Sequence, residues 1–369
     1  MEGMLRRIEG YRDEIIRLPA DLTSKVALGT QNGGTGEHEK ADFLKEKLLQ
    51  LKPDFIDEIK APDKHARHGY RPNLVARWNG VSDERTLWVL GHTDIVPPGD
   101  LSLWNSDPYQ IKVEGDRIIG RGVEDNQHGI VSSYLAKKAI VGLGEVPRKP
   151  VGLAFVADEE TGSAFGLDYI LKNHGELFRP RDLIVVPDAG NEQGTMIEVA
   201  EKSMLWLRFT VTGKQCHAST PDKGKNSLYG AARLITELDR LRREFPLEDE
   251  LFRPTRSTFE PTKMDANVPN VNTIPGRDVF HMDCRILPKY PVDAPVVKAL
   301  SASIRKVTGL EAKPMGIGGG TVAAFFRKAG LPAAVWITES GTPHQPNEFC
   351  LISNIVTDAK VFACLYMGD

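Results

Sequence analysis

The pattern of apolar and polar positions changes twice along the chain. Residues 38–52 carry apolar side chains at i, i+3, i+4 and i+7, and this spacing predicts an amphipathic helix. From about residue 72, short runs rich in Val, Ile and Leu are typical of strands buried on both faces. These runs are 74–78, 86–91, 151–156 and 183–186. Helical patterns at 129–141 and 164–171 lie between them, so we expect a large α/β domain with a mixed sheet.

Residues 204–314 show a different pattern. Apolar and polar residues alternate along 205–212, as in a half-buried strand, and the spacing of apolar residues in 226–245 predicts a long amphipathic helix. Two strand-like stretches (256–264 and 278–287) and a second helix (294–310) follow. The order β-α-β-β-α-β is that of a ferredoxin-like domain. We therefore expect an inserted α+β domain at 204–314, within a discontinuous domain of 1–203 and 315–369.

Composition and charge limit the classes of partner and the cellular compartment that we expect. The chain has 369 residues and a formal net charge of −3, without a long basic run, so neither nucleic acid nor an anionic membrane is an expected partner. No segment approaches the roughly 18 apolar residues of a membrane span, and residues 1–18 lack the apolar core of a signal peptide. The four cysteines are scattered without a CxxC pair, which fits a reducing compartment. These features predict a soluble, cytoplasmic protein.

Residue types suited to metal binding follow the apolar runs of the large domain. The run 87–91 leads into His92, the run 118–123 leads into Asp125, and 183–186 leads to Asp188. A further run ends at residue 157, directly before three consecutive carboxylates at 158–160. Because ligands of open α/β sheets lie at the carboxyl ends of the strands, we expect these side chains to meet at one edge.

Each position taken alone also has a structural interpretation. A carboxylate after a strand is often a helix N-cap or bonds to its own loop, and a lone His there is more often structural than a ligand. Three adjacent carboxylates are harder to explain this way, because they repel one another if buried. A nearby cation would relieve that repulsion, and so would full exposure to solvent.

The mixture of residue types suggests which metals are suitable. Imidazole with carboxylates suits Zn²⁺, Mn²⁺ or Co²⁺, and the absence of cysteine argues against a structural zinc site. His92 and Asp94 lie on the same side of an extended chain, so Asp94 is placed to orient His92. The adjacent side chains of Glu159 and Glu160 point in different directions, so that one can bind metal while the other acts as a general base.

Five ordered strings together resemble the M20 metallopeptidase family. They are GHTDIVPPGD (91–100), GRGVEDN (120–126), ADEETG (157–162), PDAG (187–190) and GTPHQPNE (341–348). The family includes carboxypeptidase G2-like enzymes, succinyl-diaminopimelate desuccinylase, acetylornithine deacetylase and aminoacylases. The resemblance implies a co-catalytic dinuclear site holding two divalent ions, zinc in the first place, with cobalt or manganese as alternatives.

The resemblance also implies a role for each residue of the site. His92 and Asp188 would bind one ion, Glu160 and His344 the other, and Asp125 would bridge them. Glu159 would be the general base that activates a water held between the metals, with Asp94 supporting His92. His344 taken alone would read as a surface histidine in a Pro-rich loop.

Strings in the inserted domain imply a lid and dimerisation function. GKQCHAS (213–219) resembles the segment whose histidine, here His217, stabilises the oxyanion in the partner subunit's site. A homodimer through the inserted domain is therefore expected. Asn272 and Arg285 lie in strings that resemble the substrate-contacting lid strands, where Arg285 would hold a carboxylate. The alternatives are that His217 is a loop residue with its hydrogen bonds made locally, and that Arg285 forms a structural ion pair.

The glycine-rich segment 316–321 resembles the family's binding region for the substrate carboxylate, and its candidate residues are Gly319 and Thr321. The chain has Thr321-Val322 where members often have Ser-Asp or Thr-Asp, which leaves the substrate specificity open. A second departure is Asn126-Gln127 after the bridging aspartate, where many members have Met-Lys. Neither departure removes a metal ligand.

The resemblance implies hydrolysis of the amide bond of a small N-acyl amino acid or short peptide by metal-bound hydroxide. A deacylase and a carboxypeptidase both fit, because the shared motifs do not identify the acyl group. Two other classes remain as alternatives: a catalytically silent small-molecule binding protein on the same fold, and a nucleotide-binding protein that uses residues 316–320. Against the nucleotide-binding alternative, the segment 316–320 is not followed by the lysine of a phosphate-binding loop.

Overall fold

The computed structural model describes residues 2–288 and 294–368, which divide into two compact units. Within these residues, unit 1 consists of 2–199, 294–314 and 321–368, and unit 2 consists of 200–288 and 315–320. Each unit is described by itself below.

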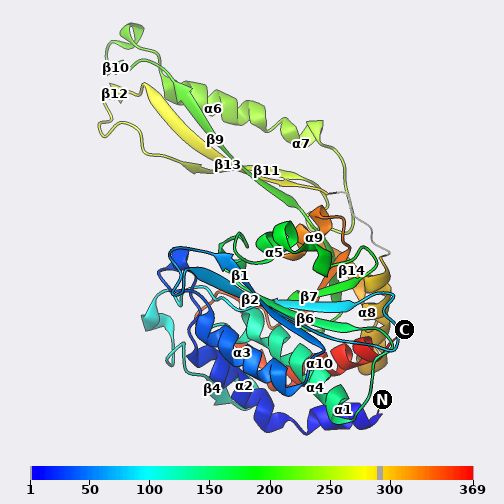
Figure 1. The fold of residues 1–369 in the computed structure, drawn as a ribbon. Coiled ribbons are helices and arrows are strands. Elements are labelled where there is room, and N and C mark those ends of the chain that lie inside the picture. The colour runs from blue at the N-terminus through cyan, green and yellow to red at the C-terminus, as the bar shows by residue number, and fades with distance from the viewer. Residues whose placement is uncertain (1, 289–293, 369) are drawn as a thin grey trace. The chain divides into compact units, whose positions relative to one another are not determined.

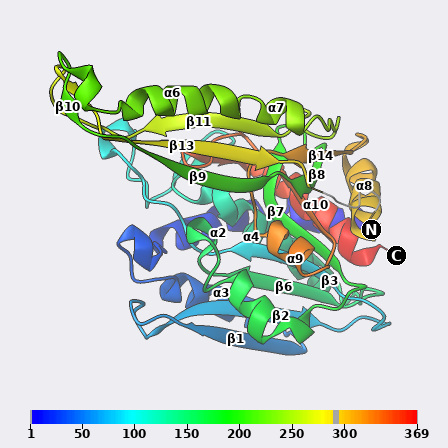
Figure 2. The ribbon, with the colours of Figure 1, turned by 90° about the horizontal axis from the view of Figure 1, so that it is seen from above.

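An eight-stranded sheet forms the centre of unit 1 (Figures 1 and 2), and its strand order is β1-β2-β6-β3-β7-β15-β8-β14. In chain order the strands are β1 (Phe55–Pro62), β2 (Tyr70–Trp78), β3 (Leu87–His92), β6 (Val151–Val156), β7 (Leu183–Asn191), β8 (Met196–Glu201), β14 (Lys313–Ile317) and β15 (Ala333–Thr338). Strand β3 runs parallel to β6 and β7, and β7 runs parallel to β15, whereas β1, β2 and β8 pair antiparallel. The mixed sheet predicted from the sequence is confirmed.

Every residue of β3, β6 and β15 is buried, as the continuous apolar runs predict. Helices on both sides of the sheet account for this burial. In Figure 1, helices α4 and α10 lie on one side and α5 and α9 on the other. The helices of unit 1 are α1 (Glu2–Glu9), α2 (Arg12–Ser24), α3 (His38–Gln50), α4 (Gly129–Gly142), α5 (Leu167–Asn173), α8 (Pro295–Thr308), α9 (Ala323–Lys328) and α10 (Ile352–Met367).

Aromatic side chains anchor the core beneath α5 and α9. Trp88 of β3 meets Phe178 edge to face at 5.2 Å between ring centroids, and Phe178 meets Phe326 of α9 in the same way at 4.9 Å. The indole N–H of Trp88 donates to the Asp182 carboxylate at 3.0 Å, so the buried ring has no unpaired donor. This packing holds β3, whose last residue is His92, in a fixed position.

Unit 2 contains a three-stranded antiparallel sheet in the order β11-β13-β9. Its strands are β9 (Ser203–Thr212), β11 (Thr258–Met264) and β13 (Arg277–Ile286), and the short strands β10 (Cys216–His217) and β12 (Thr273–Ile274) pair beside it. Helix α6 (Ser227–Leu238) packs on β13 and β9, and the single-turn helix α7 (Leu241–Glu244) follows it. The predicted helix 226–245 is thus interrupted near Asp239.

The structure draws the domain boundary differently from the expected 204–314. Helix α8, which the sequence pattern places in the inserted domain, packs against α10 and belongs to unit 1. Its buried face of Val296, Leu300 and Ile304 is covered there. Unit 2 therefore has one long helix, whereas the ferredoxin-like order requires two.

The run 118–123 is not a strand of the large sheet. Its first part belongs to β5 (Arg117–Ile119), which forms a separate small sheet with β4 (Lys112–Glu114) and β16 (Phe349–Leu351). The next residues are the helical segment Val123–His128. Among the helices of 2–288 and 294–368, none has both the length and the apolar character required to cross a bilayer.

Candidate metal centre

Three predicted ligands come from neighbouring strands of the large sheet. His92 ends β3, Glu160 lies in the turn Glu159–Thr161 directly after β6, and Asp188 lies in β7. Since β3 pairs in parallel with both β6 and β7, the carboxyl ends of these strands lie side by side. The sequence prediction that one sheet edge gathers these side chains is confirmed by this register.

The other two predicted ligands come from segments outside the large sheet. Asp125 lies where the segment Val123–His128 departs from helical geometry, and its carboxylate faces two imidazoles. Its Oδ1 is 2.7 Å from Nε2 of His92, and its Oδ2 is 3.1 Å from Nε2 of His344. Asp125 therefore contacts both histidines through different oxygens.

The five residues form two groups that share Asp125. His92, Asp125 and Asp188 make one group, and Asp125, Glu160 and His344 make the other, each with ligand atoms within 4.8 Å of one another. His92 Nε2 is 3.3 Å from Oδ1 of Asp188, and His344 Nε2 is 3.1 Å from Oε2 of Glu160. This division matches the assignment implied by the family resemblance.

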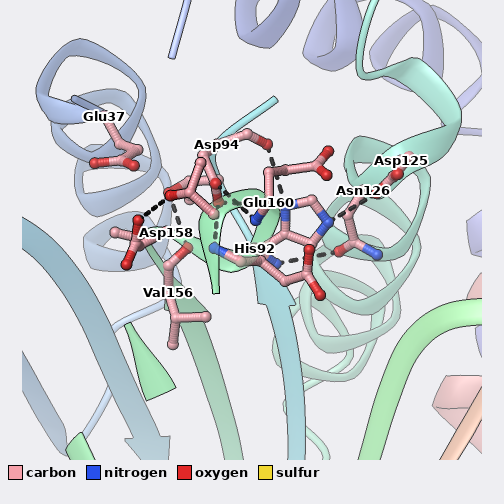
Figure 3. A network of polar contacts seen from close by, with 12 residues as sticks. Glu37, His92, Asp94, Asp125, Asn126, Val156, Asp158 and Glu160 are labelled. Carbon is pink, nitrogen blue, oxygen red and sulfur yellow. Dashed lines mark hydrogen bonds and ion pairs between the residues drawn. The ribbon is translucent and has the colours of Figure 1, made fainter. Parts of the chain in front are cut away.

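Asp94 acts on the site through both its backbone and its side chain (Figure 3). Its carbonyl oxygen is 3.1 Å from Nδ1 of His92, which leaves Nε2 directed at Asp125. The Asp94 carboxylate accepts the backbone N–H groups of Glu159 and Glu160, each at 3.0 Å. Asp94 therefore contacts both His92 and the turn that carries Glu159.

Asn126 gives the site a further link. Its side-chain oxygen accepts the backbone N–H of His92 at 3.3 Å, and its amide donates to Oδ1 of Asp188 at 2.9 Å and to the carbonyl of Pro187. The amide thus ties the loop of Asp125 to strands β3 and β7. This contact gives a role to the position where the chain departs from the family's more frequent methionine.

The protonation of the cluster reflects its excess of negative charge. Burial alone would lower the pKa of His92, but the carboxylates of Asp125, Asp188 and Asp94 raise it well above its usual value. Hydrogen bonds to Asp125 and Glu160 raise the pKa of His344 to about 10. Burial and the nearby carboxylates, Asp188 first, raise the pKa of Glu159 well above its usual value. The carboxylates therefore require compensating positive charge close to them.

The donor set fits divalent cations. Glu160 Oε1 is buried and has no hydrogen-bond partner among the described residues, which is the environment of an oxygen that binds a cation. A cation would also supply the compensating charge and leave both imidazoles neutral, the form in which histidine binds metal. Within residues 2–288 and 294–368, the Glu159 carboxylate has no hydrogen-bond partner and belongs to neither ligand group. It is therefore left free to act as a base.

A buried ion network supports the turn that carries Glu159 and Glu160. Arg71 of β2 is fully buried and donates through Nε to Glu37 at 2.7 Å, with a second, shorter bond from Nη2. Its Nη1 lies 3.5 Å from Oδ1 of Asp158, the residue before Glu159. Figure 3 shows Glu37 and Asp158 to one side of His92, and Asp125 and Asn126 to the other. The sequence analysis missed Glu37 and Arg71, because their pairing joins segments that are distant in the chain.

The candidate residues of unit 2 have contacts of their own. His217 is exposed, and its Nδ1 accepts the backbone N–H of Ser219 at 3.1 Å, so a neutral ring carries its proton on Nε2. Arg285 donates to both oxygens of Asp283, at 2.7 and 3.0 Å, and to the carbonyl of Gly318 at 2.8 Å. The structural ion pair left open for Arg285 is therefore present.

The remaining candidates differ in exposure. Asn272 is exposed, and its backbone carbonyl accepts the N–H of Ala218 at 2.8 Å. Gly319 is exposed, and a Cβ added there would meet nothing within 4 Å. Thr321 belongs to unit 1, where its hydroxyl accepts the N–H of Ala323 at 3.2 Å at the start of α9.

Three more carboxylates near the centre were not identified from the sequence. Glu124 and Glu348 are buried and hold the loops that carry Asp125 and His344. Glu339 follows β15 and accepts the N–H of Gly190 at 3.0 Å, and burial raises its pKa to about 7. Glu124 and Glu348 lie inside the motifs quoted above, one and four residues from the predicted ligands Asp125 and His344, and this proximity in sequence was the only available signal.

An α/β sheet that presents two carboxylate-imidazole groups sharing one aspartate suits a metal-dependent hydrolase. Comparison with known proteins agrees with this class. Residues 88–368 match the peptidase family M20/M25/M40. The chain belongs to this family and is a metal-dependent hydrolase that acts on peptide or amide bonds.

Individual relatives show how far the similarity extends. An uncharacterized metallohydrolase from Methanococcus maripaludis is 38% identical and matches over 95% of this chain and 98% of its own length. A succinyl-diaminopimelate desuccinylase from Paracoccus denitrificans is 32% identical over 56% of this chain and 53% of its own. The crystal structure of an M20 family metallo-carboxypeptidase from Sulfolobus solfataricus has a TM-score of 0.71 at 22% identity, covering 96% of this chain and 99% of its own. The structural match supports the fold, and the full-length relative supports the metallohydrolase class.

Proposed function

We propose that the chain is a dinuclear amidohydrolase or exopeptidase, with His92, Asp125 and Asp188 holding one divalent ion and Asp125, Glu160 and His344 the other. The observation that carries this proposal is the shared carboxylate of Asp125, whose two oxygens face different histidines. Zinc suits this set of oxygen and imidazole donors, as do cobalt and manganese. When bound, two such ions supply Lewis acidity toward the attacking water and the substrate carbonyl.

Glu159 is the proposed general base. Its carboxylate stays outside both ligand groups, on a turn fixed by hydrogen bonds from its backbone to Asp94. Burial and the nearby Asp188 carboxylate raise the pKa of Glu159, which strengthens its carboxylate as a base toward water. Asp94, which accepts the N–H of Glu160, and Asp158, which accepts the Thr161 hydroxyl, hold the turn so that Glu160 faces His344 while Glu159 remains free.

The substrate class we propose is a small N-acyl amino acid or short peptide with a free carboxylate. A partial match to a desuccinylase and a fold shared with a carboxypeptidase support this class, because both kinds of substrate offer an amide near a carboxylate. Gly319, Thr321 and Asn272 are the candidate contacts. Arg285 would have to exchange its bond to Asp283 for one to the substrate, so we assign it the weaker role of fixing Gly318.

His217 is the proposed donor to the oxyanion, acting across a homodimer. Its exposed ring with the proton on Nε2 has the hydrogen-bonding state that this role needs. Mixing His217→Ala chains with Glu159→Ala chains should restore part of the activity, because a heterodimer would contain one intact combination of residues. No recovery after demonstrated subunit exchange would contradict the cross-subunit role.

The decisive test of the function is Glu159→Ala. Turnover of N-acyl amino acids and dipeptides should fall by at least about 100-fold, since general-base catalysis contributes that much or more. Metal content by elemental analysis should stay equal to that of the wild type. Full turnover in the variant would reject Glu159 as the base, and a wild type without metal or hydrolytic activity would favour a binding protein on the same fold.

A further inference from the structure

Two buried glutamates, one from each loop, join the loop that carries Asp125 to the loop that carries His344. Glu348 is fully buried and lies in the His344 loop. Its Oε1 accepts the backbone N–H groups of Glu124 at 2.9 Å and Asp125 at 3.1 Å. Its Oε2 accepts the N–H of Gly122 at 3.0 Å and Nη1 of Arg121 at 2.5 Å. One carboxylate thus fixes the backbone of the bridging aspartate and the residues before it.

Glu124 makes the reverse connection. It is 4% exposed, and its Oε2 accepts both the N–H of Thr342 at 2.8 Å and the Thr342 hydroxyl at 2.5 Å. Its Oε1 accepts the N–H of Ser340. Each loop therefore places a glutamate against the backbone of the other, although the loops are more than 200 residues apart in the sequence.

Neither glutamate belongs to a ligand group, so their carboxylates serve the loops alone. Hydrogen bonds between an ionised carboxylate and backbone N–H groups are stronger than neutral ones and fix direction as well as distance. The hydrogen bonds of Glu348 reach the backbone of Asp125, and those of Glu124 reach Thr342, two residues before His344. His344 itself has a φ of 64°, a left-handed conformation that a non-glycine residue keeps only when its surroundings fix it.

We propose that Glu124 and Glu348 form a reciprocal clamp that sets the position of Asp125 relative to His344, and so the affinity of the ion that these residues share with Glu160. The proposal rests on the proposed dinuclear function. The clamp does not contact His92 or Asp188, which lie on β3 and β7. Its loss should therefore weaken the Asp125–Glu160–His344 group more than the group of His92.

The test compares Glu348→Gln and Glu124→Gln with Glu198→Gln. Glu198 of β8 is equally buried and pairs with Arg327 of α9, outside both loops, so it controls for the loss of a buried carboxylate. Equilibrium dialysis against Co²⁺ or Zn²⁺, followed by elemental analysis, gives the number of ions and their affinities. We expect the ion of the Asp125–Glu160–His344 group to bind about 10–100-fold more weakly in each clamp variant, as for other residues that orient metal ligands, and the other ion, which shares Asp125, to be weakened less. The control should bind both ions like the wild type.

A milder variant keeps the test valid if a clamp variant does not fold. Thr342→Val removes the hydroxyl donor to Glu124 with little change of shape, and it should weaken the same ion several-fold. Excess metal should restore turnover in all three variants with KM unchanged, which a general loss of folding would not allow. Unchanged affinities, or equal weakening of both ions, would overturn the clamp. A wild type that binds fewer than two ions would instead overturn the proposed dinuclear function, and the clamp with it.

Discussion

The carboxylate of Asp94 accepts the backbone N–H of Glu159 at 3.0 Å, and this bond links the strand that ends in His92 to the turn that carries the proposed base. The same side chain accepts the N–H of Glu160, so one carboxylate fixes both residues of the turn. Asp94 is therefore a positioning residue for two different functions. Its replacement should affect metal binding and proton transfer together.

Asp94→Asn tests this link. An asparagine keeps one acceptor oxygen and turns an amide N–H₂ toward a backbone N–H, so one of the two bonds is lost. We expect kcat to fall about 10–100-fold, and metal affinity to fall as well. Steady-state kinetics with excess metal separates the two effects, because metal saturation should restore only part of kcat. Wild-type kinetics in this variant would contradict the role.

Arg71 should be essential for stability. Replacing it by methionine leaves the buried carboxylates of Glu37 and Asp158 without their cation, and breaking such a buried pair costs about 3–5 kcal/mol. Denaturant unfolding measures this loss. The matched control is Arg67→Met, since Arg67 pairs with Glu39 at the surface and should contribute at most about 1 kcal/mol. Equal effects of the two substitutions would contradict the importance of the buried network.

The buried Lys137 should destabilise the protein at neutral pH, and this penalty should decrease as the pH rises. Burial lowers the pKa of this lysine to about 8 in the folded chain, against a reference value of 10.5, and its ammonium lies 5.1 Å from the ring of Trp78. Between these values the unfolded chain binds more protons, so the free energy of unfolding increases with pH across this window and the full penalty applies below it. Lys137→Met should remove a penalty on the order of 3 kcal/mol at pH 7.

Melting curves of wild type and Lys137→Met between pH 7 and 10 measure this effect. The difference in Tm should be largest at pH 7 and shrink as the pH rises. Lys138→Met is the control, because its ammonium pairs with Glu14 and is partly exposed. A difference that does not change with pH would contradict the lowered pKa of Lys137.

Removal of metal should destabilise unit 1. Asp125, Glu160 and Asp188 lie close together, and without a cation they must be compensated by protonated histidines. A chelator should therefore lower Tm, and the decrease should be reversed by adding back the metal. A Tm that is insensitive to chelation in a metal-loaded sample would contradict tight binding at this site.

The parts of the site predictable from sequence are those delivered by strands. His92, Glu160 and Asp188 follow apolar runs whose direction fixes where their side chains emerge, so their proximity followed from the alternation of strands and helices. Asp125 was identified through its motif, but its setting was predicted wrongly, because a helical segment rather than a strand of the large sheet carries it. The periodicity of a six-residue run does not distinguish these conformations.

Contacts between distant segments were not predictable in this way. The pairings of Glu348 with the Asp125 loop and of Arg71 with Glu37 depend on the complete fold. The same holds for α8, whose amphipathic pattern indicates a helix but not which unit covers its apolar face. Local pattern therefore predicted the elements and most of the proposed ligands, and the carboxylates that hold their loops became visible only in the structure.

The most direct test of the dinuclear centre is the metal content of the dialysed protein before and after Asp125→Ala. If Asp125 bridges two ions, the wild type should hold about two ions per chain and the variant should lose affinity for both, since the residue belongs to both groups. A wild type with a single ion, or a variant that retains two, would contradict the shared carboxylate.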